Sequence, residues 1–186
     1  ADMLFGAAFK VYTGFSSRRF TSDLHDARRD GFIGTAPHFN SVSNYLAATS
    51  LTPLLKSLIT VSSLPLKAVE TSFAVDSTGF STCRLIRWFD KKYGKEVDAH
   101  TWVKLHAMCG VQTNIVTGAD VSDWAANDSP FFAPLVNGTA AHFQIAEVSA
   151  DKAYLSHGNL ETVVRVGGVP YVPFKVNTVE PTEDSV

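Results

Sequence analysis

The stretch TSFAVD, residues 71–76, decides the fold expected for the larger part of the chain. Successive side chains alternate across an extended strand, so Phe73 and Val75 share one face while Ala74 and Asp76 share the other. Asp76 stands where the apolar run ends. We therefore expect a buried strand that ends in an acidic side chain.

A second acid has the same relation to an apolar run further along the chain. Residues 143–148 form a short apolar run, and Asp151 follows it closely. The two acids are 151 − 76 = 75 residues apart, so no local turn brings them together. Parallel pairing of their strands in one sheet would place both acids at the same edge.

The hydrophobic pattern after residue 66 predicts an α/β domain with the element order βββαβαβ. Gly110-Val111 is expected to turn a hairpin between the second and third strands, and Ser129 and Ser156 are expected to cap the two helices. The expected strands are residues 71–76, 102–109, 112–121, 143–148 and 169–174, and the first helix carries an apolar stripe of Phe132, Leu135, Val136 and Ala140. We expect a mixed sheet in which the strands at 71–76 and 143–148 are neighbours.

The residues before this domain follow a helical period. Leucine and isoleucine recur at i, i+3, i+4, i+7 and i+8 from Leu51, with Thr52 as the expected N-cap and Pro53 in the first turn. Further helices are expected at residues 2–12, 22–30 and 40–48, with Gly31 ending the second of them. The expected division is a small all-helical unit at residues 1–66 and an α/β domain at residues 67–186.

Composition and charge exclude several classes of protein. With 45% apolar residues in a chain of 186, the composition is that of an ordinary folded domain with a helical appendage. The net charge of −2 gives the whole molecule no reason to coat nucleic acid or anionic membranes. The longest apolar runs fall short of the ~20 residues that a membrane span needs, so no membrane association is expected. The opening residues have no basic region and no small-residue cleavage site, so we expect no secretory signal. Together with the two isolated cysteines, Cys83 and Cys109, this favours reduced thiols and a cytoplasmic location.

Two carboxylates that meet at one sheet edge repel each other unless a cation lies between them. Mg²⁺, or Mn²⁺ in its place, is the natural candidate, because it is bound by a few carboxylate oxygens with waters and phosphate completing the shell. The alternative is that Asp76 and Asp151 only accept hydrogen bonds from backbone N–H groups of the next turn.

Several sequence blocks around these acids resemble the DDE transposases of prokaryotic insertion sequences. The resemblance covers nearly the whole chain, and its blocks occur in the order that the family has. The blocks are FAVDSTGFS at 73–81, RWFD at 87–90, KYG at 92–94, WVKLH at 102–106, TNIVT at 113–117, NDSP at 127–130, EVSADKAY at 147–154, GG at 167–168 and PFK at 173–175.

The resemblance implies a ribonuclease-H-like catalytic domain with three acids. Asp76 matches the first acid and Asp151 matches the second. The third acid of the family is a Glu in a motif with Tyr, Arg and Lys, and nothing here matches that motif; Glu180 and Glu183 follow the last expected strand but are not assigned to the role. We therefore expect a C-terminally truncated chain that lacks the final acidic helix and has an incomplete active site.

The resemblance also implies a chemistry and its partners. The family performs metal-dependent DNA strand cleavage and strand transfer in DNA transposition, which implies Mg²⁺ or Mn²⁺ on Asp76 and Asp151. The implied partners are transposon ends and target DNA, with a homodimer for the intact enzyme and a nucleoid-associated place in the cytoplasm. Candidate DNA contacts are Arg84, Arg87, Lys91, Lys92 and Lys152. The alternative for the basic run at 84–95 is a solvated helix face paired with Asp90 and Glu96.

Other functions remain open at this point. The chain could be a non-catalytic DNA-binding or dimerisation remnant of a transposase, or a metal-dependent nuclease of the same fold with another substrate. Arginines around Gly31, namely Arg18, Arg19, Arg28 and Arg29, suit a helix-turn-helix, so the unit at 1–66 is a candidate DNA-binding unit; the alternative is an ordinary helical unit with surface arginines. His106 could approach the acidic site, although a partly buried residue with satisfied hydrogen bonds is the commoner role for such a histidine.

Overall fold

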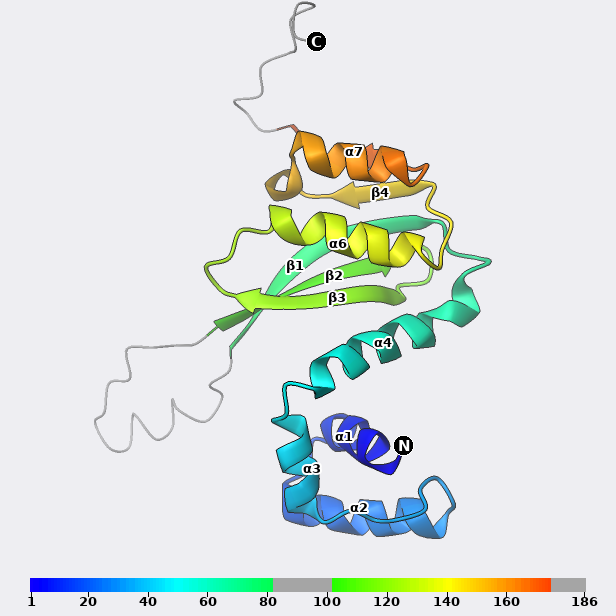
Figure 1. The fold of residues 1–186 in the computed structure, drawn as a ribbon, viewed down its shortest axis with the longest axis vertical. Coiled ribbons are helices and arrows are strands. Elements are labelled where there is room, and N and C mark those ends of the chain that lie inside the picture. Colours follow the sequence, from blue (N-terminus) through cyan, green and yellow to red (C-terminus); the bar gives the residue numbers. More distant parts are fainter. Residues whose placement is uncertain (82–101, 175–186) are drawn as a thin grey trace, which may run out of the picture. The chain divides into compact units, whose positions relative to one another are not determined.

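A computed structural model describes residues 1–81 and 102–174 of the chain (Figure 1). The chain forms two compact units, Ala1–Leu55 and Lys56–Val186. They divide within helix α4 (Leu51–Ser63). The expected division after residue 66 stays a prediction about domain organisation.

The first unit is built from helices around a small apolar core. Its helices are α1 (Asp2–Thr13), α2 (Ser17–Arg29) and α3 (Phe39–Leu46), and its buried residues are Phe20, Leu24, Ala27, Ile33 and Val42. Helix α2 begins earlier than expected because Phe20 adds one more turn to its buried face. Gly31 follows its end with φ of 83°, as the sequence predicted. The expected Thr52 cap is wrong, because α4 already begins at the buried Leu51.

The second unit contains a five-stranded mixed sheet in the order β3-β2-β1-β4-β5 (Figure 1). The strands are β1 (Ser72–Ser81), β2 (Trp102–Gly110), β3 (Val116–Asp123), β4 (Glu147–Ala150) and β5 (Val169–Tyr171). Strands β1, β2 and β3 pair antiparallel, whereas β4 and β5 continue the sheet in parallel with β1. The described elements follow the predicted order βββαβαβ, and the fold is ribonuclease-H-like.

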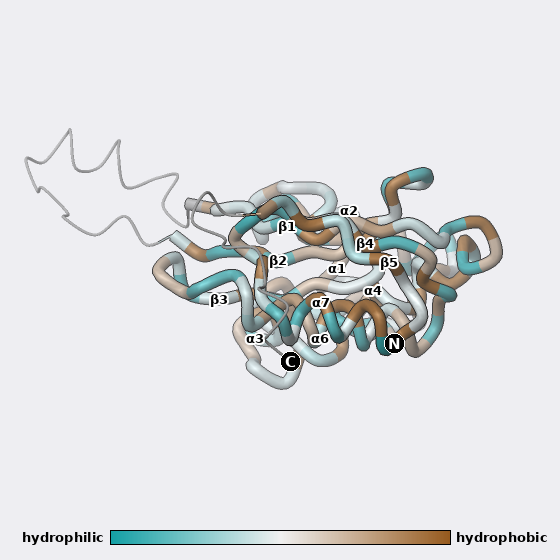
Figure 2. Tube along the Cα trace, turned by 90° about the horizontal axis from the view of Figure 1, so that it is seen from above, coloured by the Kyte–Doolittle hydropathy of each residue, from teal (hydrophilic) through white to brown (hydrophobic). Residues whose placement is uncertain are grey.

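Helices α6 (Ser129–Ala140) and α7 (His157–Arg165) lie on one face of this sheet, as Figures 1 and 2 show from two directions. The core between the two layers contains Phe73, Val75, Met108, Phe132, Leu135, Val136, Phe143, Ile145, Val148, Tyr154 and Val163. The described part of this unit also contains two short 3₁₀ helices, η1 (Leu64–Leu66) and η2 (Lys152–Tyr154). None of the helices in the described part of the chain is long and apolar enough to cross a membrane.

Helix ends and strand limits differ from the expectation in detail. Ser156 caps α7 as predicted and accepts a hydrogen bond from the backbone N–H of Asn159 at 3.2 Å. Ser129 is not the cap of α6: the N-cap is Asp128, and Ser129 is the first helical residue. Strand β4 starts at Glu147, because the preceding apolar run fills the core before it joins the ladder.

The buried carboxylate of Glu70 fixes the turn between β2 and β3. It accepts hydrogen bonds from the backbone N–H groups of Ser72, Gln112 and Thr113 and from the Thr113 hydroxyl, at 3.2, 3.1, 2.9 and 2.8 Å. Burial alone raises the pKa of Glu70, but these four donors outweigh burial and hold the pKa below its ordinary value. The turn therefore spans residues 111–115, and β3 begins later than the sequence predicted.

Replacing Gly110 with alanine tests this anchor. A Cβ at Gly110 would clash with Oε2, Cγ and Cδ of Glu70, so Gly110→Ala must push the carboxylate away from its donors. We expect the free energy of unfolding to fall by about 2 kcal/mol, measured by urea denaturation. The matched control is Gly138→Ala in α6, where a Cβ meets nothing within 4 Å. That change should stabilise the protein by about 1 kcal/mol through helix propensity, and equal effects of the two changes would contradict the anchor.

Candidate acidic site at the ends of β1 and β4

The register of the sheet places Asp76 and Asp151 side by side. In the parallel ladder of β1 and β4, Ala74 pairs with Ser149 and Val75 pairs with Ala150. Asp76 and Asp151 are the next position on each segment. Paired positions of a parallel ladder share a face, so both acids belong to the face opposite the buried Val75, away from α6 and α7. The predicted parallel pairing of their strands is confirmed.

The sequence predicted that the first strand ends at Asp76, but β1 continues beyond this residue. It continues to Ser81 because β2 keeps pairing with it as far as Trp102. Only the ladder with β4 stops at Val75. Asp76 thus lies where β1 loses one of its two neighbours, which leaves its side chain exposed beside Asp151.

Each carboxylate accepts one local backbone hydrogen bond. Asp76 Oδ1 accepts from the N–H of Ser77 at 2.7 Å, and Asp151 Oδ1 accepts from the N–H of Ala153 at 2.6 Å. These bonds are of the kind expected if the two acids only accept hydrogen bonds from backbone N–H groups, which was the alternative to metal binding. They occupy one oxygen of each acid, and a carboxylate has two oxygens, so the second remains for another ligand.

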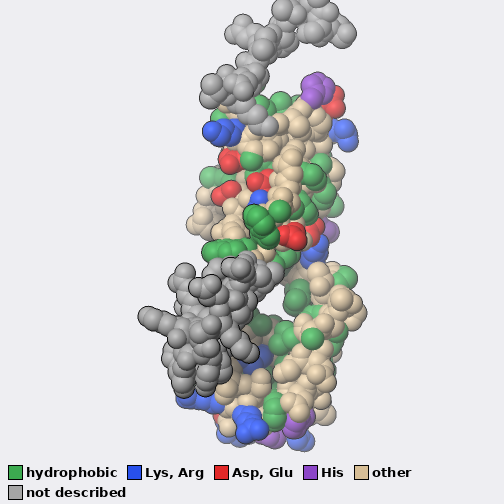
Figure 3. All heavy atoms as spheres, turned by 90° about the vertical axis from the view of Figure 1, so that its left-hand side faces the viewer, with side chains coloured by type: hydrophobic (Ala, Val, Ile, Leu, Met, Phe, Trp, Pro, Cys, Tyr) green, Lys and Arg blue, Asp and Glu red, His purple; other side chains and the backbone are tan. Residues whose placement is uncertain are grey.

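The surroundings of the two acids are negative. Figure 3, which looks onto the end of the sheet at which β4 terminates, shows acidic side chains gathered there. Among the described residues, no Lys or Arg forms an ion pair with Asp76 or Asp151. Lys152 follows Asp151 directly, but its side chain is exposed and unpaired within the described part of the chain. A cation would therefore meet uncompensated charge.

Asp76 and Asp151 supply some, but not all, of the ligands that a divalent cation needs. Two carboxylates with waters and a phosphate oxygen suit Mg²⁺ or Mn²⁺, which rarely needs a cage made only of protein groups. Over residues 1–81 and 102–174, however, no three His, Cys, Asp or Glu side chains cluster closely enough to hold a metal. Glu180 and Glu183 lie outside the described residues, so the third acid stays without an assignment.

A buried polar layer lies beneath the site, on the face that carries the helices. His106 is opposite Ser77 in the ladder of β1 and β2, is fully buried, and stacks on Phe131 with ring centroids 4.0 Å apart. Its Nε2 is 2.9 Å from the Ser122 hydroxyl, and its Nδ1 is 3.7 Å from Oδ1 of Asp128 without a hydrogen bond. Burial lowers the pKa of His106, and the charge of Asp128 partly opposes this. His106 is thus more deeply buried than the sequence suggested.

The sequence did not single out three residues of this layer, namely Lys104, Asp128 and Tyr154. Lys104 donates to the Asp128 carboxylate and to the carbonyl of Ala126, each at 2.9 Å. Tyr154, three residues after Asp151, is fully buried. The signal was present, because all three stand in the sequence blocks that resemble transposases, but neither spacing nor periodicity gives them a role.

Most of the remaining residues named from the sequence fall in the part of the chain that the structure does not describe. Arg84, Arg87, Lys91, Lys92 and Cys83 lie outside the described residues. Cys109 is a free thiol, and burial together with the charge of Asp76 raises its pKa.

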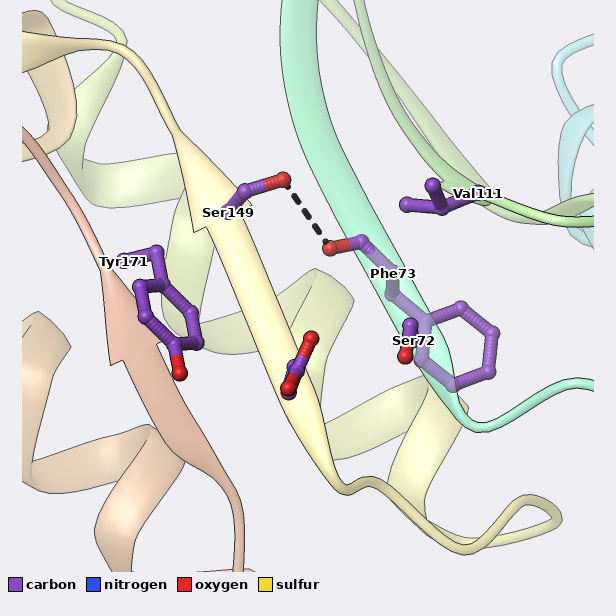
Figure 4. A pocket seen from close by; sticks show the side chains of 6 residues that line it. Ser72, Phe73, Val111, Ser149 and Tyr171 are labelled. Carbon is purple, nitrogen blue, oxygen red and sulfur yellow. Dashed lines mark hydrogen bonds between the residues drawn. The ribbon is translucent and has the colours of Figure 1, made fainter.

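A shallow hollow of about 280 Å³ lies on the helix-free face of the sheet (Figure 4). Its walls include Ser72 of β1, Glu147 and Ser149 of β4, and Tyr171 of β5. Ser149 donates to the carbonyl of Phe73 at 3.3 Å, the bond drawn in Figure 4. Since residues 147, 149 and 151 alternate onto one face, the hollow and the acidic site share that face.

Residues 67–182 match the family described as "Transposase DDE domain". Because the match covers more than half of the chain, the protein belongs to the DDE transposase family. Its function is therefore related to transposition, and divalent metal ions are the cofactors generally used in that family.

The chain is also similar to a solved structure, the cryo-EM structure of a piggyBac transposase synaptic complex with hairpin DNA. The identity is 11% and the TM-score is 0.40, over 97% of this chain and 43% of that chain. The chain thus spans less than half the length of that transposase. None of the curated proteins compared with the chain matches it.

The environment of His106 generates a prediction about its charge. Because burial lowers its pKa, we expect the imidazole to stay neutral at pH 7 and to titrate below the ordinary histidine range of about 6.5. Asp128→Asn should lower the pKa further, since it removes a charge that favours the imidazolium. Heteronuclear NMR of the ring nitrogens across pH 4–8 measures both. A pKa at or above the ordinary value, or a rise in Asp128→Asn, would contradict this environment.

Proposed function

We propose that this chain carries the metal-binding core of a transposase that cleaves DNA strands and transfers them to target DNA. Asp76 and Asp151 are the two acids of that core. The observation that supports this most is the register of β1 and β4, which brings two acids 75 residues apart to one edge and one face in a member of the DDE family.

The two residues have a simple task in this proposal. Their second carboxylate oxygens hold a divalent cation, while the hydrogen bonds from Ser77 and Ala153 fix the first oxygens. When bound, such an ion activates the attacking oxygen and neutralises charge on the phosphate. The acids lie on the helix-free face, so a DNA strand can approach them without displacing α6 or α7.

The site needs a third acid for full activity. Since two carboxylates hold one ion weakly and two ions poorly, we expect this chain alone to bind Mg²⁺ or Mn²⁺ but not to cut DNA efficiently. A homodimer is a further part of this proposal.

DNA is the proposed partner, as transposon ends and as target. Lys152 stands next to Asp151 and is exposed, so it can contact a phosphate that reaches the acids. The basic run with Arg84, Arg87, Lys91 and Lys92 and the helical unit at 1–66 are further proposed contacts. Nucleoid association follows from the same proposal.

Metal binding tests the acidic pair directly. We expect Mn²⁺ to bind the full chain and, at a free concentration ten times its Kd, to raise the free energy of unfolding by about 1.4 kcal/mol. Asp76→Asn and Asp151→Asn should each abolish the effect, because either change removes half of the ligand set. Electron paramagnetic resonance of free Mn²⁺ and thermal unfolding measure the two quantities.

The control for this experiment is Glu161→Gln, which removes one exposed carboxylate on α7 and should leave Mn²⁺ binding unchanged. If Mn²⁺ still stabilises both aspartate variants, the proposal of a shared metal site is wrong. A non-catalytic DNA-binding role would then be the better conclusion.

Salt dependence tests the DNA contacts. Phosphate contacts release counterions, so the affinity for duplex DNA should fall linearly with salt on a logarithmic plot, with a slope of about −0.9 per contact. Lys152→Gln should make the slope shallower by about one unit, whereas Lys67→Gln, an exposed lysine before β1, should not. Fluorescence anisotropy with a labelled duplex measures this. Binding that ignores salt would argue against phosphate contacts.

A further inference from the structure

Tyr154 is tied to the segment that carries Asp151. Its backbone N–H donates to the carbonyl of Asp151 at 3.1 Å, and its own carbonyl accepts from Nδ2 of Asn159 at 2.8 Å. Its ring packs against Phe132, with centroids 5.8 Å apart. These contacts fix the position of Tyr154 relative to Asp151.

The hydroxyl of Tyr154 is a buried donor that lacks a closed hydrogen bond. The side chain is 1% exposed, and Oη has no partner of normal hydrogen-bond geometry among the described residues. Burial raises the pKa of Tyr154 to about 12; the nearby Ser77 hydroxyl opposes the rise, and the charges of Asp128, Asp76 and Asp151 add to it. The phenol thus keeps its proton at neutral pH. A buried donor left without an acceptor costs about 1–3 kcal/mol.

Ser77 is hydrogen-bonded to the other acid, in this case to its side chain. Its N–H donates to the Asp76 carboxylate, and its side chain alternates with that of Asp76, so it belongs to the helix-covered face where Tyr154 is buried. The ladder of β1 and β4 has already ended at Val75 and Ala150. Within the described part of the chain, no backbone hydrogen bond joins the two segments beyond that point.

We propose that a hydrogen bond from the Tyr154 hydroxyl to the Ser77 hydroxyl sets the spacing of Asp76 and Asp151, so that both hydroxyl residues are positioning residues of the acidic site. The proposal rests on the proposed function of that site. The hydrogen bond forms when a divalent cation draws the two acids together. It then links the two segments beyond the last backbone pair of the β1–β4 ladder. Neither hydroxyl touches the cation.

Removal of each hydroxyl tests the proposal on the full chain. Tyr154→Phe keeps the ring and Ser77→Ala keeps the strand, and each should weaken Mn²⁺ binding about 10-fold, measured by electron paramagnetic resonance. The double variant should be no weaker than either single one, because both changes remove the same bond. Ser77→Thr keeps a hydroxyl and should retain most of the affinity.

The matched control removes a buried hydroxyl pair elsewhere. The hydroxyls of Thr117 and Thr139 are 2.8 Å apart, on β3 and near the C-terminal end of α6. Thr139→Val should lower the unfolding temperature and leave Mn²⁺ affinity unchanged, which separates loss of stability from loss of positioning.

The outcomes separate the two proposals. If Asp76→Asn abolishes Mn²⁺ binding while Tyr154→Phe and Ser77→Ala bind as the wild type does, the positioning role is overturned and the acidic site stands. If Asp76→Asn binds Mn²⁺ normally, the proposed function itself fails. Should Tyr154→Phe not fold, the comparison of Ser77→Ala with Ser77→Thr decides: equal affinities overturn the inference.

Discussion

The parallel ladder between β1 and β4 is the constraint on which the rest of the second unit depends. It joins segments far apart in sequence, so the loss of chain entropy on closing the loop has to be offset by burial. Phe73 and Val148 are paired in this ladder and almost completely buried, and each fully buried side chain of this kind contributes about 1.5–3 kcal/mol. The apolar face of the ladder thus holds the segments together, and its other face can carry two acids without adding to stability.

Glu70 shows how the start of β1 is held in register. Its carboxylate binds the backbone of Ser72 at the beginning of β1 and that of the turn after β2. A slip of β1 by one residue would exchange its two faces and carry Asp76 into the core. An ionised group fully buried at the far end of the strand therefore supports the register that exposes the acid.

The sequence predicted the order of the elements and the pairing of β1 with β4, because alternation and helical periodicity report which face is buried. It could not predict where strands stop, since the continuation of β1 past Asp76 depends on pairing with β2 rather than on local residues. Nor could it find the roles of Glu70 or Tyr154. From the sequence, Glu70 looks like a surface residue and Tyr154 looks like an ordinary core residue. Only the tertiary structure shows that donors surround the carboxylate of Glu70 and that the Tyr154 hydroxyl has no acceptor among the described residues.

Two adjacent carboxylates without a basic partner are a cost to the fold, because their repulsion favours separation of the segments that carry them. The ladder ends one residue before the acids, so backbone pairing does not oppose that separation directly. The local hydrogen bonds from Ser77 and Ala153 orient each carboxylate but do not join one to the other. In the proposed site a cation converts this repulsion into attraction, and the proposed hydrogen bond between Tyr154 and Ser77 sets the distance between the two acids. On this proposal, the affinity for the ion depends directly on the spacing of the two acids.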